Sequence, residues 1–330
     1  NLVFNHTFTC SPQEMGLPGQ EYFAGTHFNP QVTWWEESTA FIDYMRRCQF
    51  LAHQGRFVAD VVHYYGDHIP NVFARKGHDP AGALPGYDYD VLSEELLLSN
   101  LELKDGRLVL PSGMEYRVLS LPDHGVLSLG ALEKIDALVR AGATVLGPKP
   151  REAVSLEQGE EGARRFRELA DGLWGAGNPP EGARRARKVG QGSVHWGITA
   201  SDVLRANGIG PDVEFWLRGG APSSDTDWIH RRLGEADVYF LAELSGKPRN
   251  EQVSFRVTGR IPELWNPVDG SIREAASFSV RNGRTTVPLR LGPYDSMFVV
   301  FRKATQERDR SAGPNEPTWQ QLGNVPGPWT

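Results

Sequence analysis

Two hydrophobic patterns alternate through the middle of the chain: short apolar runs, and longer segments in which apolar residues recur every three or four positions. The runs at 57–64 and 143–146 predict buried strands, and the spacing at 128–141 and 160–174 predicts helices. Strands that are apolar on both faces are typical of a parallel sheet covered by helices. We therefore predict a flavodoxin-like α/β layer over residues 55–224. Further elements expected there are strands at 116–121, 192–196 and 213–216, helices at 90–98 and 200–206, and a hairpin at 101–110.

Local signals support two of these elements. Ser128 is a suitable N-cap for the helix over 128–141, and Gly142 is a suitable residue to end it. The Asp105-Gly106 pair is a typical two-residue hairpin turn.

From about Asp225 onward, apolar and polar residues alternate. Short alternating segments separated by turns such as Asn282-Gly283 are typical of an antiparallel β-sandwich. We predict this sandwich over residues 225–302 and a polar, Pro- and Gly-containing linker over 303–330. The expected strands are 236–241, 253–257, 276–280, 285–291 and 297–302.

The first 54 residues predict a single strand, loop and helix. Residues 2–8 read as a short apolar strand, a long loop extends to Thr33, and residues 34–53 show helical spacing. One such unit cannot form a domain. Because the chain opens directly on a strand and closes on Trp329, which has no following segment to pack against, we expect an internal piece of a longer polypeptide.

Composition adds mainly exclusions. The 330 residues carry a formal net charge of −6, which argues against a nucleic-acid or anionic-membrane partner. No apolar run approaches the roughly 18 residues that a membrane-spanning helix needs. Cys10 and Cys48 are expected to be unpaired thiols. The sequence has no Gly-rich phosphate loop and no zinc-ligand spacing, so we expect neither a nucleotide nor a metal site in this chain.

The main candidate chemistry lies in the loop over 20–36, which combines aromatic rings with carboxylates and an amide. An indole offers a flat apolar face to the CH side of a pyranose, and carboxylates and amides can bind its hydroxyls. One of the two Trp residues is expected to stack on sugar and the other to pack in the helix core. The alternative is a loop that packs its own aromatic residues. The candidate sugar contacts are Glu21, His27, Asn29, Trp34 and Trp35.

The remaining acidic candidates each have a structural alternative. Asp88 lies in a short acidic segment that could reach toward a binding site, whereas neighbouring Asp90 could cap the helix predicted at 90–98. Glu36 and Glu37 are expected in a first helical turn, where carboxylates interact favourably with the helix dipole, rather than as catalysts.

Several motifs together resemble the α-L-rhamnosidases of glycoside hydrolase family 106, and the similarity extends over almost the whole chain. The resemblance implies release of terminal α-L-rhamnose from glycans or glycosides with inversion, a reaction that uses two carboxyl groups about 6.5–9.5 Å apart. The motifs are His6–Pro12, Gly25–Pro30, Thr33–Trp35, Tyr44–Leu51, Val58–Val61, Gly86–Asp90, Tyr116–Leu119, Ala141–Pro150, His230–Arg232, Asp237–Phe240 and Pro262–Trp265.

The resemblance also implies an order of domains. Residues 1–54 correspond to the last βα portion of a (β/α)8 barrel, and residues 303–330 lead into a further sandwich. The catalytic glutamates, with any calcium ligands, are implied upstream of Asn1, so the chain alone is expected to be inactive. His6 corresponds to the carboxyl end of a barrel strand, where barrel active sites form, and is a candidate either to bind hydroxyls or to be structural.

Two alternatives remain open. One is a β-galactosidase-like hydrolase with the same order of barrel and α/β layer, and the other is a non-catalytic carbohydrate-binding or scaffold protein. A carbohydrate is the expected partner. The sequence leaves open the linkage, the aglycone, the oligomeric state and the compartment, whether periplasmic, extracellular or cytoplasmic.

Overall fold

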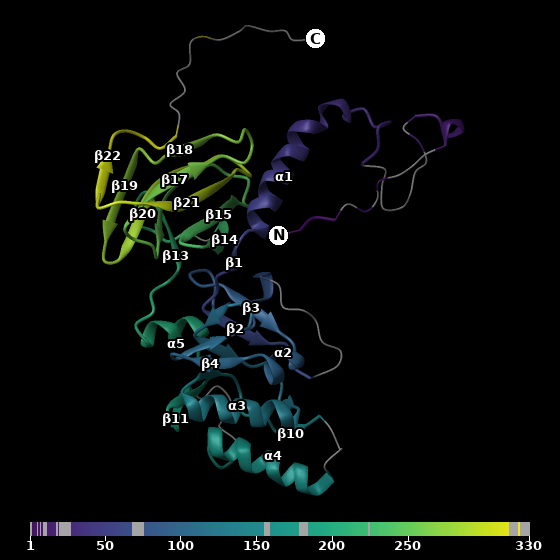
Figure 1. Cartoon of the computed structure of the whole chain (residues 1–330), viewed down its shortest axis with the longest axis vertical. Coiled ribbons are helices and arrows are strands. Elements are labelled where there is room, and N and C mark those ends of the chain that lie inside the picture. Colours follow the sequence, from purple (N-terminus) through teal and green to yellow (C-terminus); the bar gives the residue numbers. More distant parts are fainter. Residues whose placement is uncertain are drawn as a thin grey trace.

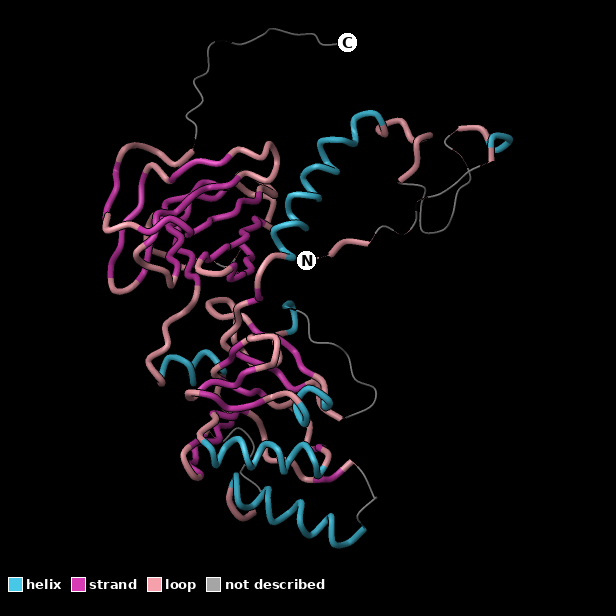
Figure 2. Tube along the Cα trace, in the orientation of Figure 1, coloured by secondary structure: helices cyan, strands magenta, loops and turns pink. Residues whose placement is uncertain are grey.

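The computed structural model describes residues 2–4, 6, 8, 12–17, 19, 28–67, 76–154, 159–177, 184–223, 225–316 and 323. Figure 1 shows three parts: an α/β layer, a β-sandwich, and an N-terminal segment whose helix α1 (Thr39–His53) lies beside the sandwich. Figure 2 shows that helices gather on the α/β layer, whereas the sandwich consists of strands and loops. The predicted mixture of α/β and antiparallel β structure is confirmed.

The α/β layer is built on a six-stranded sheet whose strands all pair in parallel, except that the edge strand β11 pairs antiparallel with β12. Numbered along the chain, its parallel strands lie in the order 2-1-3-4-5, which is the order of flavodoxin-like doubly wound sheets. Across the sheet the strands are β3 (Tyr89–Leu92), β2 (Val61–Tyr64), β7 (Val118–Ser120), β9 (Thr144–Leu146), β12 (Gly192–Trp196) and β11 (Arg185–Val189).

Each face of this sheet has its own core. Val62 and Leu119 pack in one buried cluster with helices α3 (Leu129–Ala141) and α4 (Gly159–Trp174). Val61 and Val118, the preceding residues on the same strands, pack in another cluster with α5 (Ala200–Ala206). Because successive side chains of a strand point to opposite faces, this two-sided burial explains why the strands are continuous apolar runs.

Helix α3 and the neighbouring hairpin form as predicted. The Ser128 hydroxyl accepts a hydrogen bond from the Ala131 amide at 3.1 Å, and Gly142 ends the helix with a φ of 127°. The hairpin turns at Asp105 and Gly106, which both have positive φ. Its strands β4 (Glu102–Lys104) and β5 (Arg107–Val109) are extended by β6 (Glu115–Tyr116) into a small antiparallel sheet.

The helix predicted over 90–98 is wrong in its first part. Residues 89–92 form β3 and pair in parallel with β2, so that helix α2 is confined to Glu94–Ser99. Ser93, not Asp90, caps α2, and the Asp90 carboxylate instead accepts a hydrogen bond from the Tyr116 hydroxyl at 2.6 Å. Pairing with β2 outweighs the local helix signal because it buries Tyr89 and Leu92.

The sandwich consists of two antiparallel sheets with a shared core that includes Trp228, Tyr239, Phe255, Val287 and Phe301. One sheet contains, in order, β1 (Arg56–Phe57), β14 (Thr226–Leu233), β15 (Ala236–Glu243), β21 (Ser296–Ala304), β17 (Arg260–Trp265) and β18 (Ile272–Glu274). The other contains β13 (Val213–Leu217), β16 (Arg249–Phe255), β20 (Arg284–Leu291), β19 (Ser277–Arg281) and β22 (Asp309–Ser311). The shorter elements of the chain are β8 (Val126–Leu127), β10 (Glu152–Ala153) and the 3-10 helices η1 (Gln13–Met15), η2 (Glu36–Ser38) and η3 (Lys76–His78).

Three predictions about strand membership are wrong. The run over 57–64 is divided, because β1 pairs with β14 of the sandwich and only β2 enters the parallel sheet. Strand β13, expected in the α/β layer, pairs with β16 of the sandwich. Strand β22 lies within the predicted linker yet pairs with β19. In each case the strand's partner is distant in sequence, and a pattern along the chain does not identify that partner.

Helix α1 packs against the sandwich rather than the α/β layer. Cys48 and Leu51 lie against Val238 and Phe298 on the outer face of the first sheet. The predicted helix start at residue 34 is too early, since α1 begins at Thr39 after η2. The strand predicted over 2–8 is also not formed by residues 2–4; of the described residues in this range, only Phe8 makes a strand-like bridge, to Phe28. No helix among the described residues is long and apolar enough to cross a membrane.

Candidate functional site

An aromatic cluster forms where the N-terminal segment meets the start of α1. The bridge between Phe8 and Phe28 brings two distant parts of the segment together. The Phe28 ring meets Trp34 edge to face at 5.6 Å between centroids, and Phe8 meets Trp35 similarly at 5.9 Å. Such edge-to-face pairs are favourable because the ring edge is positive and the ring face negative. We call Phe8, Phe28, Trp34, Trp35 and Phe41 the aromatic cluster.

The two indoles of this cluster differ in exposure. Trp34 is 39% exposed, whereas Trp35 is half-buried. Both lie in a series of tight turns, in which the Trp35 amide donates to the Val32 carbonyl and the Glu37 amide donates to the Trp34 carbonyl. Trp34 is therefore the indole with more surface available for a sugar ring.

The polar candidates of the same loop have different positions. Asn29 is buried, and its side-chain oxygen accepts a hydrogen bond from the Gln31 amide at 2.8 Å, which is the backbone-satisfying interaction that the sequence offered as an alternative. His6 is exposed. Glu21 and His27 lie outside the described residues. Glu36 and Glu37 are exposed in the first turn of η2, as expected for residues that interact with a helix terminus.

Asp88 lies apart from the aromatic cluster. Asp88 precedes β3 in the α/β layer. The aromatic cluster lies at the amino end of α1, and Figure 1 shows that this end of the helix points away from the α/β layer. The buried Asp88 carboxylate forms an ion pair with Lys76 at 3.1 Å, and Lys76 also pairs with Asp227 of β14 at 3.2 Å. Burial raises the pKa of Asp88 to about 6, although the charge of Lys76 opposes the shift. This arrangement connects the α/β layer to the sandwich.

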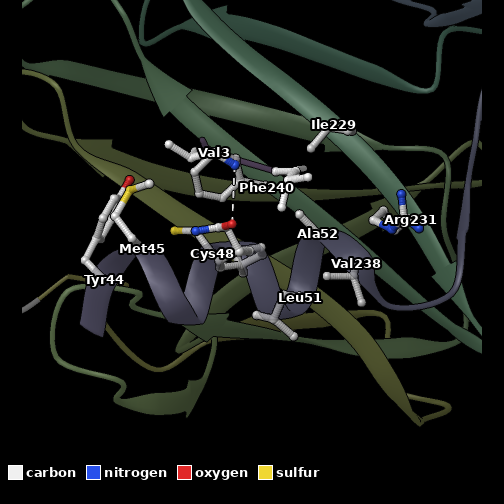
Figure 3. Close-up of a pocket in the computed structure, with 13 residues that line it drawn as sticks. Val3, Tyr44, Met45, Cys48, Leu51, Ala52, Ile229, Arg231, Val238 and Phe240 are labelled. Carbon is white, nitrogen blue, oxygen red and sulfur yellow. Dashed lines mark hydrogen bonds between the residues drawn. The ribbon is translucent and has the colours of Figure 1, made fainter. Parts of the chain in front are cut away.

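An apolar cavity of about 240 Å³ lies between α1 and the first sheet of the sandwich (Figure 3). Cys48 and Leu51 line it from the helix, Phe240 lines it from β15, and the Val3 amide donates to the Gln49 side chain beside it at 3.3 Å. Cys48 has a free thiol, as predicted, and burial raises the pKa of that thiol, so the nucleophilic thiolate is disfavoured. Cys10 lies outside the described residues. With so few polar groups in its lining, this cavity is a gap in the packing rather than a sugar site.

A buried charged network, which the sequence reasoning missed, joins the two folded parts. His230 of β14 is held between Asp212 at 2.8 Å and Asp237 at 2.9 Å, and its ring stacks on Tyr239. Arg256 of the sandwich donates to Asp60, in the segment between β1 and β2, at 2.8 Å. The sequence did contain a signal for this network, namely the motifs His230–Arg232 and Asp237–Phe240. The two motifs lie on neighbouring strands, which their spacing along the chain did not reveal.

The network shifts the protonation of its members. Burial alone would lower the pKa of His230, but the two facing carboxylates outweigh burial and raise it. Burial likewise acts to raise the pKa of Asp212, yet the charge of His230 and its hydrogen bond lower that pKa to about 2. The two carboxylates therefore favour the protonated form of the His230 imidazole at this junction of the two parts.

The described residues offer no evident metal site. Among them, no group of three or more His, Cys, Asp or Glu side chains is placed to hold a metal ion. His63, at the end of β2, is buried beside Ser120, and burial lowers the pKa of its imidazole to about 4.

Comparison with known proteins identifies the family. A model of the α-L-rhamnosidases of glycoside hydrolase family 106 matches residues 1–280. A protein of Formosa agariphila named "Putative beta-glucuronidase" is 35% identical over 92% of this chain and 24% of its own length. The structure of a rhamnosidase from Novosphingobium sp. PP1Y matches with a TM-score of 0.74 and 32% identity, over 91% of this chain and 27% of that chain.

A solved structure with much lower sequence identity has a similar fold. A β-galactosidase from Bacillus circulans sp. alkalophilus matches with a TM-score of 0.51 and 10% identity, over 85% of this chain and 48% of that chain, which shows a common fold alone. The chain spans about a quarter of the length of the Formosa agariphila protein and of the Novosphingobium rhamnosidase. Since the family model matches most of the sequence, the chain belongs to glycoside hydrolase family 106, the family of the α-L-rhamnosidases.

Proposed function

We propose that this chain is part of an inverting glycoside hydrolase that removes terminal α-L-rhamnose from glycans or glycosides. The observation that carries the proposal is the match of the α-L-rhamnosidase model to residues 1–280, supported by 32% identity to a solved rhamnosidase at a TM-score of 0.74. Family membership supports hydrolysis of a glycosidic bond, and rhamnose is the sugar that these two comparisons favour.

The aromatic cluster is the proposed wall of the substrate site. Trp34 stacks on the apolar face of the sugar, because it is the more exposed indole and Phe28 holds it edge to face. Trp35 and Phe8 pair edge to face within the same cluster. His6, Glu21 and His27 are the proposed hydroxyl-binding residues. Because Asn29 and Asp88 are buried and bonded within the chain, we assign them structural roles instead.

The catalytic acid and base are proposed to lie in parts of the enzyme outside this chain. Two facts support this division: the chain spans about a quarter of the length of its relatives, and large apolar side chains of the first 54 residues are open to solvent. Phe4, Leu17 and Phe50 are 85%, 80% and 66% exposed. Apolar surface of this extent is typical of a face that other structure covers. The missing cover is proposed to be the rest of a (β/α)8 barrel, of which residues 1–54 are the last portion.

Inversion then requires two carboxyl groups about 6.5–9.5 Å apart, one to protonate the leaving oxygen and the other to activate water on the opposite face of the sugar. This chain is proposed to contribute substrate contacts and the residues that hold them in place. By itself it is expected to be inactive. Any calcium ion of the complete active site is proposed to bind the barrel residues outside the chain.

A second candidate activity is hydrolysis of β-glucuronides. The observation in its favour is the 35% identity to the Formosa agariphila protein over 92% of this chain. The β-galactosidase likeness, at 10% identity, supports only the fold.

Hydrolysis of aryl glycosides tests the proposal. We expect aryl α-L-rhamnoside to be cleaved by the chain extended at its amino end through a complete barrel, and not by the chain alone. Cleavage of aryl β-D-glucuronide instead would establish the second candidate. Activity of the isolated chain would overturn the assignment of the catalytic pair, and inactivity of the extended protein on both sugars and on aryl β-D-galactoside would favour a non-catalytic carbohydrate-binding role.

A variant pair tests the role of the aromatic cluster in the extended enzyme. Replacing the stacking ring in Trp34→Ala should raise KM about tenfold. Trp216→Ala removes an indole of similar exposure from β13 of the sandwich, outside the cluster, and should leave KM unchanged. Equal effects of the two substitutions would contradict a stacking role for Trp34.

A further inference from the structure

An arginine-lined cavity of about 190 Å³ lies where the α/β layer, the small β4–β5–β6 sheet and the sandwich meet. Its guanidinium groups come from elements far apart in sequence, including β1, β5, β14 and the segment after β16. We call it the arginine cavity. Its arginines are Arg56, Arg107, Arg117, Arg232 and Arg256, and the carboxylates among its described lining residues are Asp60 and Glu115.

The carboxylates do not balance these arginines. Asp60 pairs with both Arg117 at 3.3 Å and Arg256 at 2.8 Å, and Glu115 pairs with Arg107 at 3.2 Å. Asp237, which does not line the cavity, pairs with Arg232 at 3.1 Å and also with His230 at 2.9 Å. Even if Asp212 and Asp237, which do not line the cavity, are included, four carboxylates are set against five guanidinium groups, so positive charge remains in excess.

The guanidinium groups retain donors for a ligand. Arg56 donates to the Gly113 carbonyl at 2.8 Å, and Arg117 and Arg232 each donate to one carboxylate. Each guanidinium has five N–H groups in a fixed planar fork, so these single bonds to described residues leave further N–H groups at the cavity. The side chains of Arg107, Arg117, Arg232 and Arg256 are between 27% and 51% exposed, which keeps the cavity open to solutes.

Like charges crowd around Arg117. Burial lowers the pKa of Arg117, and the neighbouring charges of Arg107 and Arg256 lower it further, although Asp60 opposes the shift. An anion between these groups would relieve this repulsion, and partly desolvated charge-assisted hydrogen bonds are stronger than those in water.

We propose that the arginine cavity is a binding site for a small oxyanion, such as inorganic phosphate or sulfate or the acidic group of a small acid. Its size favours such a ligand, since pockets for larger organic ligands measure about 300–1,000 Å³. The bound anion would bridge Arg117, which directly precedes β7 of the α/β layer, to the arginines that belong to the sandwich: Arg56, Arg232 and Arg256. The site is independent of the aromatic cluster and of the glycosidase activity proposed above.

Titration calorimetry of the 330-residue chain with sodium phosphate, sodium sulfate and sodium glucuronate, at constant ionic strength maintained with chloride, tests the proposal. We expect saturable binding of at least one oxyanion in excess of chloride. A preference for phosphate or sulfate would identify a free inorganic ion as the ligand, and a preference for glucuronate would identify an acidic sugar. No binding of any of the three would overturn the proposal.

Matched variants locate the site. The double variant Arg56→Gln/Arg232→Gln should weaken binding about tenfold or more, because two charge-assisted donors are lost. Arg218→Gln removes the same kind of charge from an exposed position with no hydrogen bond to a described residue, and should change Kd less than about twofold. Glu115→Gln removes a competing carboxylate and should tighten binding about two- to fivefold.

The opposite direction of the Glu115→Gln effect keeps the test valid if the arginine variants fold poorly, because a damaged fold does not bind more tightly. Equal loss in the double variant and in Arg218→Gln, or weaker binding by Glu115→Gln, would contradict the assignment of the site.

Discussion

Helices α1 and α3 have similar lengths and the same spacing of apolar residues, yet they are packed very differently. Helix α3 buries six of its 13 residues between the parallel sheet and α4. Helix α1, all of whose 15 residues are described, buries none of them, although Cys48 and Leu51 lie against the sandwich. Phe41 and Phe50 of α1 are 49% and 66% exposed.

The difference shows what an apolar stripe does and does not specify. The stripe predicts that one helix face will be covered, but the structure that covers it can lie anywhere in the polypeptide. For α3 the cover is in this chain. For α1 the sandwich covers part of the stripe, and the proposed barrel would cover the rest. Substitutions in the two regions should therefore have unequal effects.

The largest effect is expected at the buried charged network around His230, where the α/β layer meets the sandwich. His230→Gln leaves Asp212 and Asp237 without their cationic partner and should lower the free energy of unfolding by about 3–5 kcal/mol, measured by urea unfolding. His53→Gln, at the exposed end of α1, is the matched control and should change stability by less than about 0.5 kcal/mol. Similar losses in both variants would show that α1 is as firmly packed as the junction.

Cavity-forming substitutions compare the two helices directly. Leu132→Ala in α3 removes a fully buried side chain and should cost about 2–5 kcal/mol. Phe50→Ala in α1 removes a larger but mostly exposed ring and should cost less than about 0.5 kcal/mol in this chain. The comparison fails if Phe50→Ala proves the more destabilising in urea unfolding.

Acid pH should weaken the junction before it affects α1. Because the pKa of Asp212 falls from 3.8 to about 2 on folding, its ionised form contributes about 2 kcal/mol above pH 4, and this contribution is lost as the pH falls toward 2. His230 has the opposite sign: with its pKa raised above 6.5, its contribution is full below that pH and is lost as the pH rises through the raised value. Unfolding free energies measured across pH should therefore decline at both ends.

Asp212→Asn tests whether Asp212 causes the loss of stability at acid pH. This substitution should reduce the loss of stability between pH 4 and pH 2. Asp43→Asn on α1 removes a partly exposed carboxylate that pairs only with the exposed Arg46 among the described residues, and should change the loss little. If the loss of stability between pH 4 and pH 2 is unchanged in Asp212→Asn, the acid sensitivity belongs to other carboxylates.

Helix caps provide the smallest contrast. The Ser128 hydroxyl caps α3, so Ser128→Ala should cost about 1 kcal/mol. Ser38 occupies the corresponding position before α1 but makes no capping hydrogen bond through its side chain, and Ser38→Ala should cost less than about 0.5 kcal/mol. Thermal unfolding of both variants would distinguish these effects, and a larger shift for Ser38→Ala would contradict them.

The fold was predictable wherever its determinants are local. Helix α3 was predicted with both ends because its spacing, N-cap and terminal glycine lie within 15 consecutive residues. Strand β14 was missed because His230 and Arg232 resemble surface residues. The carboxylates that pair with them come from β15 and from the residue before β13. Strands β13 and β22 were misplaced for a similar reason, since only their distant partners determine which sheet they join.

The candidate site was predictable in part. The paired Trp residues before α1 identified the segment that forms the aromatic cluster, because aromatic residues in a turn-rich loop must pack on one another or bind a ligand. The ion pairs that connect Asp88 to Lys76 and the sandwich could not be read from the sequence, because Lys76 and Asp227 come from different parts of the fold. The arginine cavity was equally hidden, since its arginines are separated by up to 200 residues.

Hydrogen exchange followed by mass spectrometry on this chain tests the central claim most directly, because it measures local opening of α1 and α3 in one experiment. If the N-terminal unit is completed by the rest of a glycosidase barrel, amides of residues 39–53 should exchange far faster than those of 129–141 in this chain, and should become protected when the chain is extended through the barrel. Equal protection of both helices in the isolated chain would contradict the account.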